Sequence, residues 1–172
     1  MNINCEDMLI HQPDGSCISC KSSLKYLGAQ LAADGLIDSE IAQKIGKASQ
    51  DFKVLKQFWN HCNIPIQFKF IVFSACIVQR LLYSLEGAWL NKHLVKKLDG
   101  FYCKCLRRIL GISHSYISRI SNAFILKQFN SKPLSQILLY RQLILFGRIA
   151  RMSDSTTMRQ CVFAEQSVEL AR

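Results

Sequence analysis

The sequence predicts a mainly α-helical fold, with a small β-hairpin near the N-terminus and a bundle of about five helices after it. Two observations predict this class. After residue 36, apolar residues recur at steps of three and four through five segments, which is the spacing of one helix face. Before residue 36 the pattern alternates instead, next to strong turn residues. With 172 residues, 49% of them hydrophobic, the chain can bury a core without a metal or a disulfide.

The hairpin is predicted within residues 1–35. Its turn is expected at residues 13–16 (PDGS), because Asp-Gly supplies the positive φ angles that a tight turn needs. Residues 4–10 and 17–30 would form its two arms. Gly28 lies inside the second arm and predicts either a β-bulge or a close approach of the backbone to another part of the chain.

The first two helices are expected over residues 38–62 and 66–85, with Pro65 between them. Asp38 is a suitable N-cap for the first helix. Its apolar face is formed by residues at helical spacing: Ile41, Ile45, Ala48, Phe52, Leu55 and Trp59. The second helix is apolar on nearly all sides, so we expect it to be the central, buried helix of the bundle.

The third helix, over residues 91–111, has one cationic and one apolar face. Six basic residues fall between roughly 0° and 160° on a helical wheel counted from the first of them: Lys92, Lys96, Lys97, Lys104, Arg107 and Arg108. Asp99 is the only acid in the segment, and Gly111 is well placed to end the helix as its C′ residue. Two interpretations of the cationic face stay open: a solvated surface, or a surface that binds an anionic partner.

Two more helices complete the predicted bundle. Ser121 is the expected N-cap of the first, over residues 122–129. The second covers residues 134–151 and carries Arg141, Arg148 and Arg151. The helical region therefore extends over residues 36–152. Residues 153–172 are weakly patterned and are expected to form a weakly ordered tail.

The charge is concentrated in the second half of the chain. The formal net charge is +10, yet residues 1–35 contain two Lys and four acids, whereas residues 91–152 contain twelve Lys and Arg and one Asp. This asymmetry favours a polyanionic partner, nucleic acid before a membrane surface. The longest apolar run, residues 70–78, is too short to span a membrane. No signal peptide is recognisable, so we expect an intracellular protein of the nucleus or cytoplasm with reduced cysteines, and not a secreted one.

The motifs that would indicate an enzyme or a metal site are missing from the sequence. Cys17 and Cys20 have the spacing of a zinc or redox pair, but the other close pair, Cys103 and Cys105, would point in different directions on a helix. No Ser-His-Asp set, glycine-rich phosphate loop or constellation of paired carboxylates stands out. No catalytic residue, metal ligand or cofactor is therefore assigned to this chain.

Three stretches, in this order and spacing, carry a family resemblance: residues 24–28 (LKYLG), residues 81–83 (LLY) and residues 105–112 (CLRRILGI). Together they resemble the C-terminal part of the reverse transcriptases encoded by non-LTR (LINE-type) retrotransposons. The resemblance covers about residues 13–152. The sequence departs from the family at Ser84, where a glycine usually follows the tyrosine, and at residues 145–148 (LFGR), where the family usually has WLGH.

The resemblance implies specific roles. Tyr26, Leu27 and Gly28 would correspond to the primer grip, the hairpin that holds the primer strand. The helices would correspond to the thumb and to the region after it, and both would follow the template–primer duplex. The implied partner is therefore RNA or an RNA–DNA duplex. The residues implied in nucleic-acid binding are Lys92, Lys96, Lys97, Lys104, Arg107, Arg108, Arg141 and Arg148.

In that family the catalytic aspartates, which hold Mg²⁺, precede the grip. The sequence contains no such Asp-Asp motif. The resemblance therefore implies a fragment of an RNA-directed DNA polymerase that is inactive by itself but keeps a basic surface for nucleic acid. The alternatives are a non-enzymatic helical module that binds a protein partner or a second copy of itself through exposed apolar residues, and, after it, a zinc-dependent module.

Overall fold

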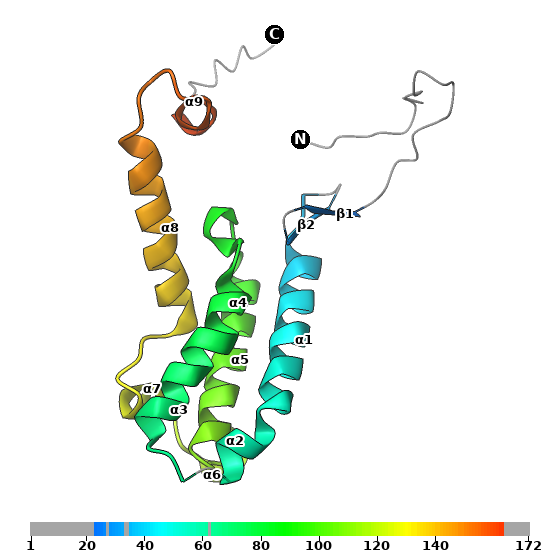
Figure 1. Ribbon diagram of the computed structural model, residues 1–172, viewed down its shortest axis with the longest axis vertical. Helices are drawn as coiled ribbons and strands as arrows, with labels where there is room; N and C mark the ends of the chain where they lie inside the picture. Colours follow the sequence, from blue (N-terminus) through cyan, green and yellow to red (C-terminus); the bar gives the residue numbers. More distant parts are fainter. Residues whose placement is uncertain (1–22, 27, 33–34, 62, 164–172) are drawn as a thin grey trace, which may run out of the picture.

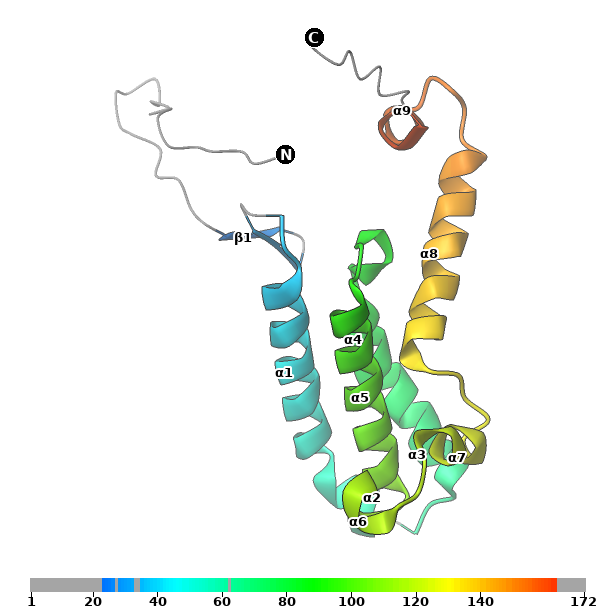
Figure 2. The ribbon, with the colours of Figure 1, turned by 180° about the vertical axis from the view of Figure 1, so that it is seen from behind.

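The computed structural model describes residues 23–26, 28–32, 35–61 and 63–163, and this part of the chain is mainly α-helical with one small antiparallel hairpin, as predicted (Figure 1). The long helical stretches run roughly along the long axis of the molecule. The hairpin lies at one end of the first helix (Figure 1). The short helices α2 (Lys56–His61), α6 (Ser115–Ser118) and α7 (Asn122–Gln128) lie at the opposite end (Figures 1 and 2). The five expected helices are all present, with further short ones between and after them.

The hairpin turn lies later in the sequence than the Asp-Gly motif predicts. Strands β1 (Ser23–Tyr26) and β2 (Ala29–Ala32) pair antiparallel with Tyr26 opposite Ala29, so the connection is residues 27–28. Gly28 has φ +88° and forms this turn, so the expected bulge is wrong. The close approach is confirmed, because a Cβ on Gly28 would lie 3.1 Å from Cε1 of Tyr83. Residues 4–10 and 13–16 lie outside the described residues.

The helix expected over residues 38–62 is divided at Leu55 into α1 (Asp38–Val54) and α2 (Lys56–His61). Ile37 is the N-cap residue and gives no side-chain hydrogen bond, so Asp38 is the first helical residue and not the cap. At the other end, the indole N–H of Trp59 donates to the Phe52 carbonyl at 3.0 Å. This bond satisfies a carbonyl near the end of α1, where intrahelical partners run out.

The second expected helix consists of α3 (Ile66–Phe73), a π-helical segment (Ser74–Val78) and α4 (Gln79–Leu82) in succession, followed by a 3₁₀ turn, η2 (Leu85–Gly87). Only one side of it is buried. Phe68 and Ile71 on α3 are each 59% exposed. The expectation that this helix is the central one is therefore wrong, because none of the described helices covers its outer side.

The central helix is α5 (Lys92–Ile109), which packs against α1, α2, α3, α7 and α8. Asn91 caps its start by accepting from the Leu94 N–H at 2.9 Å. Gly111, at φ +70°, ends it as predicted: the Gly111 N–H donates to the Arg108 carbonyl and the Ile112 N–H to the Arg107 carbonyl at 2.9 Å. This is the double hydrogen bond of a Schellman cap.

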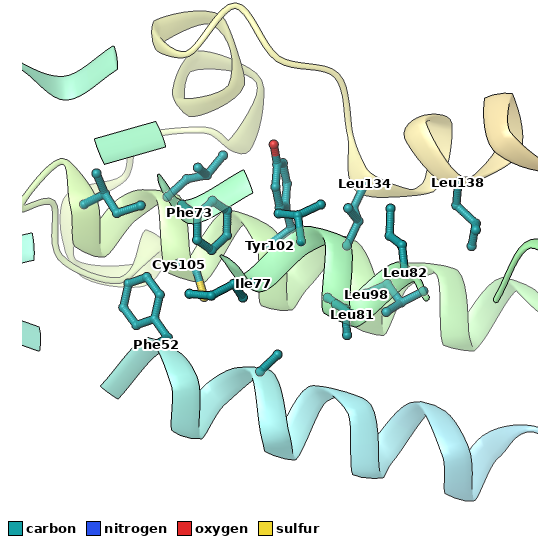
Figure 3. Packing of buried hydrophobic residues seen from close by; sticks show 14 of the residues in the cluster. Phe52, Phe73, Ile77, Leu81, Leu82, Leu98, Tyr102, Cys105, Leu134 and Leu138 are labelled. Carbon is teal, nitrogen blue, oxygen red and sulfur yellow. The ribbon is translucent and has the colours of Figure 1, made fainter. Parts of the chain in front are cut away.

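The core forms between the apolar face of α5 and the facing sides of its neighbours (Figure 3). Phe52 of α1 packs edge-on against Phe73 of α3 with ring centroids 6.0 Å apart, and Phe73 in turn packs against Tyr102 of α5 at 5.7 Å. The Tyr102 hydroxyl lies 2.7 Å from Ser131 Oγ, so its polar atom is satisfied. The apolar faces predicted for the first and third helices are confirmed by this burial.

After α5 come α6 (Ser115–Ser118), α7 (Asn122–Gln128), α8 (Leu134–Ala150) and α9 (Thr157–Phe163). Ser121 caps α7 as predicted, accepting from the Phe124 N–H at 3.2 Å. The α9 helix lies inside the segment that was expected to be a weakly ordered tail. Among the described helices, none combines the length and the apolar character that crossing a membrane requires.

The start of α8 is held by a side chain of α5. Asp99 accepts from the Ser135 N–H at 2.8 Å and from the Ser135 hydroxyl at 2.7 Å. A carboxylate at a helix N-terminus satisfies free N–H groups and faces the positive end of the helix dipole. The single acid of the cationic segment therefore has a structural role and positions α8, which then extends away from the bundle (Figure 1).

Candidate nucleic-acid interface

The basic residues predicted to bind nucleic acid do not share one environment. Six of the eight are exposed to solvent: Lys92, Lys96, Lys97, Lys104, Arg108 and Arg148. Arg107 is buried and Arg141 is partly buried. The first five exposed residues lie on α5, whereas Arg148 lies on α8. The structure therefore supports a shared surface for the α5 residues only.

Three of these residues form a straight line that we call the α5 strip: Lys97, Lys104 and Arg108. Their separations of seven and four residues place them within about 40° of one another around the helix. At a rise of 1.5 Å per residue, Lys97 and Lys104 are about 10 Å apart along the helix axis, and Lys104 and Arg108 are about 6 Å apart. In the described part of the chain, no ion pair involves any of the three. The strip is thus a set of uncompensated charges held on the most firmly packed helix.

Arg107 is not part of this surface, which corrects the helical-wheel prediction. Its side chain is 5% exposed, and its guanidinium donates to the Ile120 carbonyl at 2.6 Å, Asn122 Oδ1 at 2.9 Å and Ser118 Oγ at 3.3 Å. These acceptors lie in α6, α7 and the segment between them. Arg107 therefore holds that part of the chain against α5. All three acceptors are neutral, so its positive charge stays without an acidic partner among the described residues.

Arg141 is also engaged within the chain. Its guanidinium donates to Gln79 Oε1 at 2.5 Å and lies 3.7 Å from Glu86 Oε1. It joins α8 to α4 and to the η2 turn. Since its charge is partly compensated there, Arg141 is a weaker candidate for a phosphate contact than the α5 strip.

A second cationic feature lies beside the C-terminal end of the strip. We call it the α2–α5 groove, an open cleft of about 620 Å³. Lys53 and Lys56 lie on one side of it, and Arg108, Gly111 and Ser113 lie on the other. The other lining residues are Phe52, Trp59, Asn60 and Ile112, so none of the described residues that line the groove carries a carboxylate.

Lys53 and Lys56 are not among the residues that the sequence predicts to bind nucleic acid. On a helical wheel they lie off the apolar face of their helix, which is the ordinary position of a solvated lysine. Only the packing of α1 and α2 against α5 brings them near Arg108. The predicted helix over residues 38–62 runs unbroken through both lysines, so no local signal in the sequence could have paired them with α5.

The primer-grip-like residues contact the second stretch of the family resemblance. Gly28 lies against the ring of Tyr83, and Tyr26 is 59% exposed next to it; Leu27 lies outside the described residues. Lys44 reaches over the Tyr83 ring, with Nζ 5.6 Å from its centroid, and donates to the Tyr83 carbonyl at 2.5 Å. Burial lowers the pKa of Lys44, and the charge of nearby Glu40 opposes this shift. The two stretches, more than fifty residues apart, thus form one local structure.

The residue after Tyr83, Ser84, has a backbone conformation that glycine adopts more easily. It has φ +64°, in the left-handed region that glycine adopts without strain. Its hydroxyl donates to Oε1 of the buried Glu40 at 3.0 Å, and Lys44 lies 3.6 Å from the same atom. A serine at this position therefore gains a hydrogen bond that offsets part of the backbone strain.

Two of the thiols in the described residues are buried on α5, those of Cys103 and Cys105. Burial raises the pKa of Cys103, and it raises the pKa of Cys105 to about 12. Both thiols are therefore protonated and behave as small apolar groups. The described residues contain no group of three or more His, Cys, Asp or Glu that could hold a metal ion. Cys17 and Cys20 lie outside the described residues.

Comparison of the chain with protein-family models, curated proteins and solved structures finds no match.

Proposed function

We propose that this chain binds nucleic acid through its phosphate backbone, as the C-terminal, non-catalytic part of a LINE-type reverse transcriptase. The observation that carries the proposal is the α5 strip: three exposed, unpaired basic residues in line on the central helix. Lys92 and Lys96, exposed on the first turns of the same helix, extend the charged surface. The partner class is RNA or an RNA–DNA duplex.

The family part of the proposal rests on the sequence resemblance. It is supported by the contact of Gly28 with Tyr83, because the YLG and LLY stretches then act together to fix the hairpin on the helical bundle. It is supported further by Ser84, whose positive φ is the conformation for which a glycine is suited at the position where the family usually has one.

The chemistry of the strip predicts binding without base specificity. Lysine and arginine side chains contact phosphates, and each contact releases condensed counterions. With three to five contacts, the slope of log K against log salt would be about −3 to −4.5. Raising the salt from about 50 mM to about 200 mM would then weaken binding roughly 40- to 500-fold.

The test is a fluorescence-anisotropy titration of a labelled RNA–DNA duplex at those two salt concentrations. The variant Lys104→Gln/Arg108→Gln should weaken binding and reduce the salt slope by about two. The control Lys127→Gln/Arg151→Gln removes the same two residue types from exposed positions on α7 and next to α8, and it should keep the slope. No binding of the unmodified chain at low salt, or equal losses in both variants, would refute the proposal.

The proposal assigns no catalytic step to this chain. Polymerisation in the parent family depends on Mg²⁺ held by paired aspartates, and this sequence has no Asp-Asp pair. A primer-extension assay with the purified chain should give no product. Detectable synthesis that is lost on chelation of Mg²⁺ would contradict the assignment.

A second candidate function is a helical module that binds a protein or a second copy of the chain. It is favoured by α8, where apolar side chains stay exposed along the outer face: Leu139, Tyr140, Leu143 and Phe146, each between 51% and 67%. Such a face is unusual for a monomer and is typical of an interface. Size-exclusion chromatography at several concentrations tests it: a concentration-dependent shift that Leu139→Glu/Leu143→Glu abolishes would favour this function, and a constant monomer would exclude self-association.

A further inference from the structure

We infer that the α2–α5 groove receives an unpaired nucleic-acid strand, so that the chain prefers a single strand, or a duplex with a single-stranded extension, over a blunt duplex. The inference rests on the proposed function, which concerns the α5 strip. It assigns a separate role to Lys53 and Lys56, residues that the strip does not include.

The arrangement of charge favours a strand that passes between two walls. Lys53 and Lys56 flank the break between α1 and α2, and Arg108 faces them from the end of α5. All three side chains are exposed. The strip leads into this groove, because Arg108 belongs to both. A phosphate backbone that follows the strip would therefore reach two further cations at its end.

The size of the groove favours an unpaired strand. Its volume of about 620 Å³ is that of a small-molecule site. A duplex presents only its backbone and its grooves to a helix surface, since its bases are stacked and paired. An unpaired nucleotide can instead turn its base toward the protein.

The lining of the groove offers contacts that a base can use. Phe52, Trp59 and Ile112 are the apolar side chains among the lining residues. Asn60, which can donate and accept through its amide, and the Ser113 hydroxyl are the polar lining groups. Among the described residues, the lining contains no carboxylate that would repel phosphate.

The helix end at the groove does not oppose an anion strongly. The carbonyls of Leu106, Arg107 and Arg108 at the end of α5 accept hydrogen bonds from the N–H groups of residues 110–112. Their negative charge is therefore largely satisfied within the chain. The exposed lysine and arginine side chains then dominate the local field.

The experiment compares three labelled ligands of the same sequence at low salt: a single-stranded RNA, a blunt RNA–DNA duplex, and that duplex with a single-stranded RNA extension. The variant Lys53→Gln/Lys56→Gln should weaken binding of the single strand and the extended duplex at least tenfold, and of the blunt duplex less than twofold. The control Lys47→Gln/Lys127→Gln, which neutralises two exposed lysines outside the groove, should change all three equally and slightly.

A second readout comes from the two tryptophans. Trp89 is 94% exposed, whereas Trp59 is buried and is one of the residues that line the groove. In a Trp89→Phe background, the single strand should change the Trp59 emission and the blunt duplex should not. Poly-glutamate of matched charge serves as a competitor, because an acidic peptide is the other macromolecule that such a groove would attract.

The outcomes separate the inference from the proposed function. Equal affinity for all three ligands, with equal losses in Lys53→Gln/Lys56→Gln, would overturn the inference and leave strip binding intact. Displacement of the single strand by poly-glutamate at equal charge concentration would also overturn it. If the unmodified chain binds none of the ligands at low salt, the proposed function fails and the inference fails with it.

Discussion

Replacing Arg107 by methionine should unfold the chain at a lower temperature, whereas the same change at its neighbour Arg108 should not. The Arg107 side chain is 5% exposed and donates to three acceptors, while the Arg108 side chain is exposed and makes no hydrogen bond to the described residues. Methionine keeps most of the aliphatic volume. The experiment therefore removes the guanidinium and little else.

The magnitude follows from the geometry. Two of the Arg107 bonds are short, at 2.6 Å and 2.9 Å, and the third is long, at 3.3 Å. Hydrogen bonds from a charged donor contribute about 1.5–3 kcal/mol each, so the two short ones together give about 3–6 kcal/mol. The cost of burying a guanidinium without an acidic partner offsets part of this. We expect a net loss of about 2–3 kcal/mol, which corresponds to a fall in Tm of roughly 5–10 °C for a chain of this size.

The assay is thermal unfolding followed by circular dichroism, with RNA–DNA binding measured on the same samples well below the Tm. Arg107→Met should lower the Tm and keep most of the binding. Arg108→Met should change stability by no more than about 0.5 kcal/mol and weaken binding. Equal Tm values for the two variants, or a selective loss of binding in Arg107→Met with an unchanged Tm, would show that the buried position of Arg107 is not its position in solution.

Three further predictions concern other parts of the fold. Asp99→Ala should destabilise the chain by about 1–2 kcal/mol in urea unfolding, because the first turn of α8 loses its cap; a change below about 0.5 kcal/mol would contradict the capping role. Gly28→Ala should lower the free energy of unfolding by about 1–2 kcal/mol, because Gly28 has a positive φ and lies close to Tyr83. Gly46→Ala should raise the free energy of unfolding by about 0.5–1 kcal/mol, because Gly46 lies within a helix with open space around it. A higher Tm for Gly28→Ala than for Gly46→Ala would refute both assignments. At pH 8, iodoacetamide mapping by mass spectrometry should label the exposed Cys76 much faster than Cys105, whose pKa of about 12 keeps it a thiol; equal rates would show that the core opens readily.

Periodicity predicted the helices well because burial of one face fixes the spacing of apolar residues. Ile41, Phe52 and Leu98 are buried where the pattern placed them. The turn of the hairpin was a harder case. Asp-Gly at residues 14–15 is the stronger local signal, yet the described hairpin turns at residues 27–28. Gly28 is used there because both the positive φ and the contact with Tyr83 require a residue without a side chain, and the second requirement cannot be read from local sequence.

The charged residues of α5 were predicted less well, for a different reason. A helical wheel gives the direction of a side chain around its own helix, but not what covers that direction. Arg107 lies between Lys96 and Lys104 on the wheel, yet α6, α7 and the segment between them supply its acceptors. Asp99 likewise reads as an isolated acid and is in fact the cap of α8. The structural roles of Arg107 and Asp99 both depend on contacts with segments that come later in the chain.

The segments that cover the Arg107 side of α5 also determine where the candidate site lies. Because α7 and the segment before it pack over the C-terminal half of α5 on the Arg107 side, the exposed charge there is limited to the side that holds Lys104 and Arg108. That side faces α2, where the break at Leu55 places Lys53 and Lys56 across the groove. The cationic surface is therefore narrower on α5 than the sequence predicted, but it continues onto a second element. A strand bound along it would contact helices whose basic residues are about fifty positions apart, so its affinity would depend on the packing of the bundle as well as on charge.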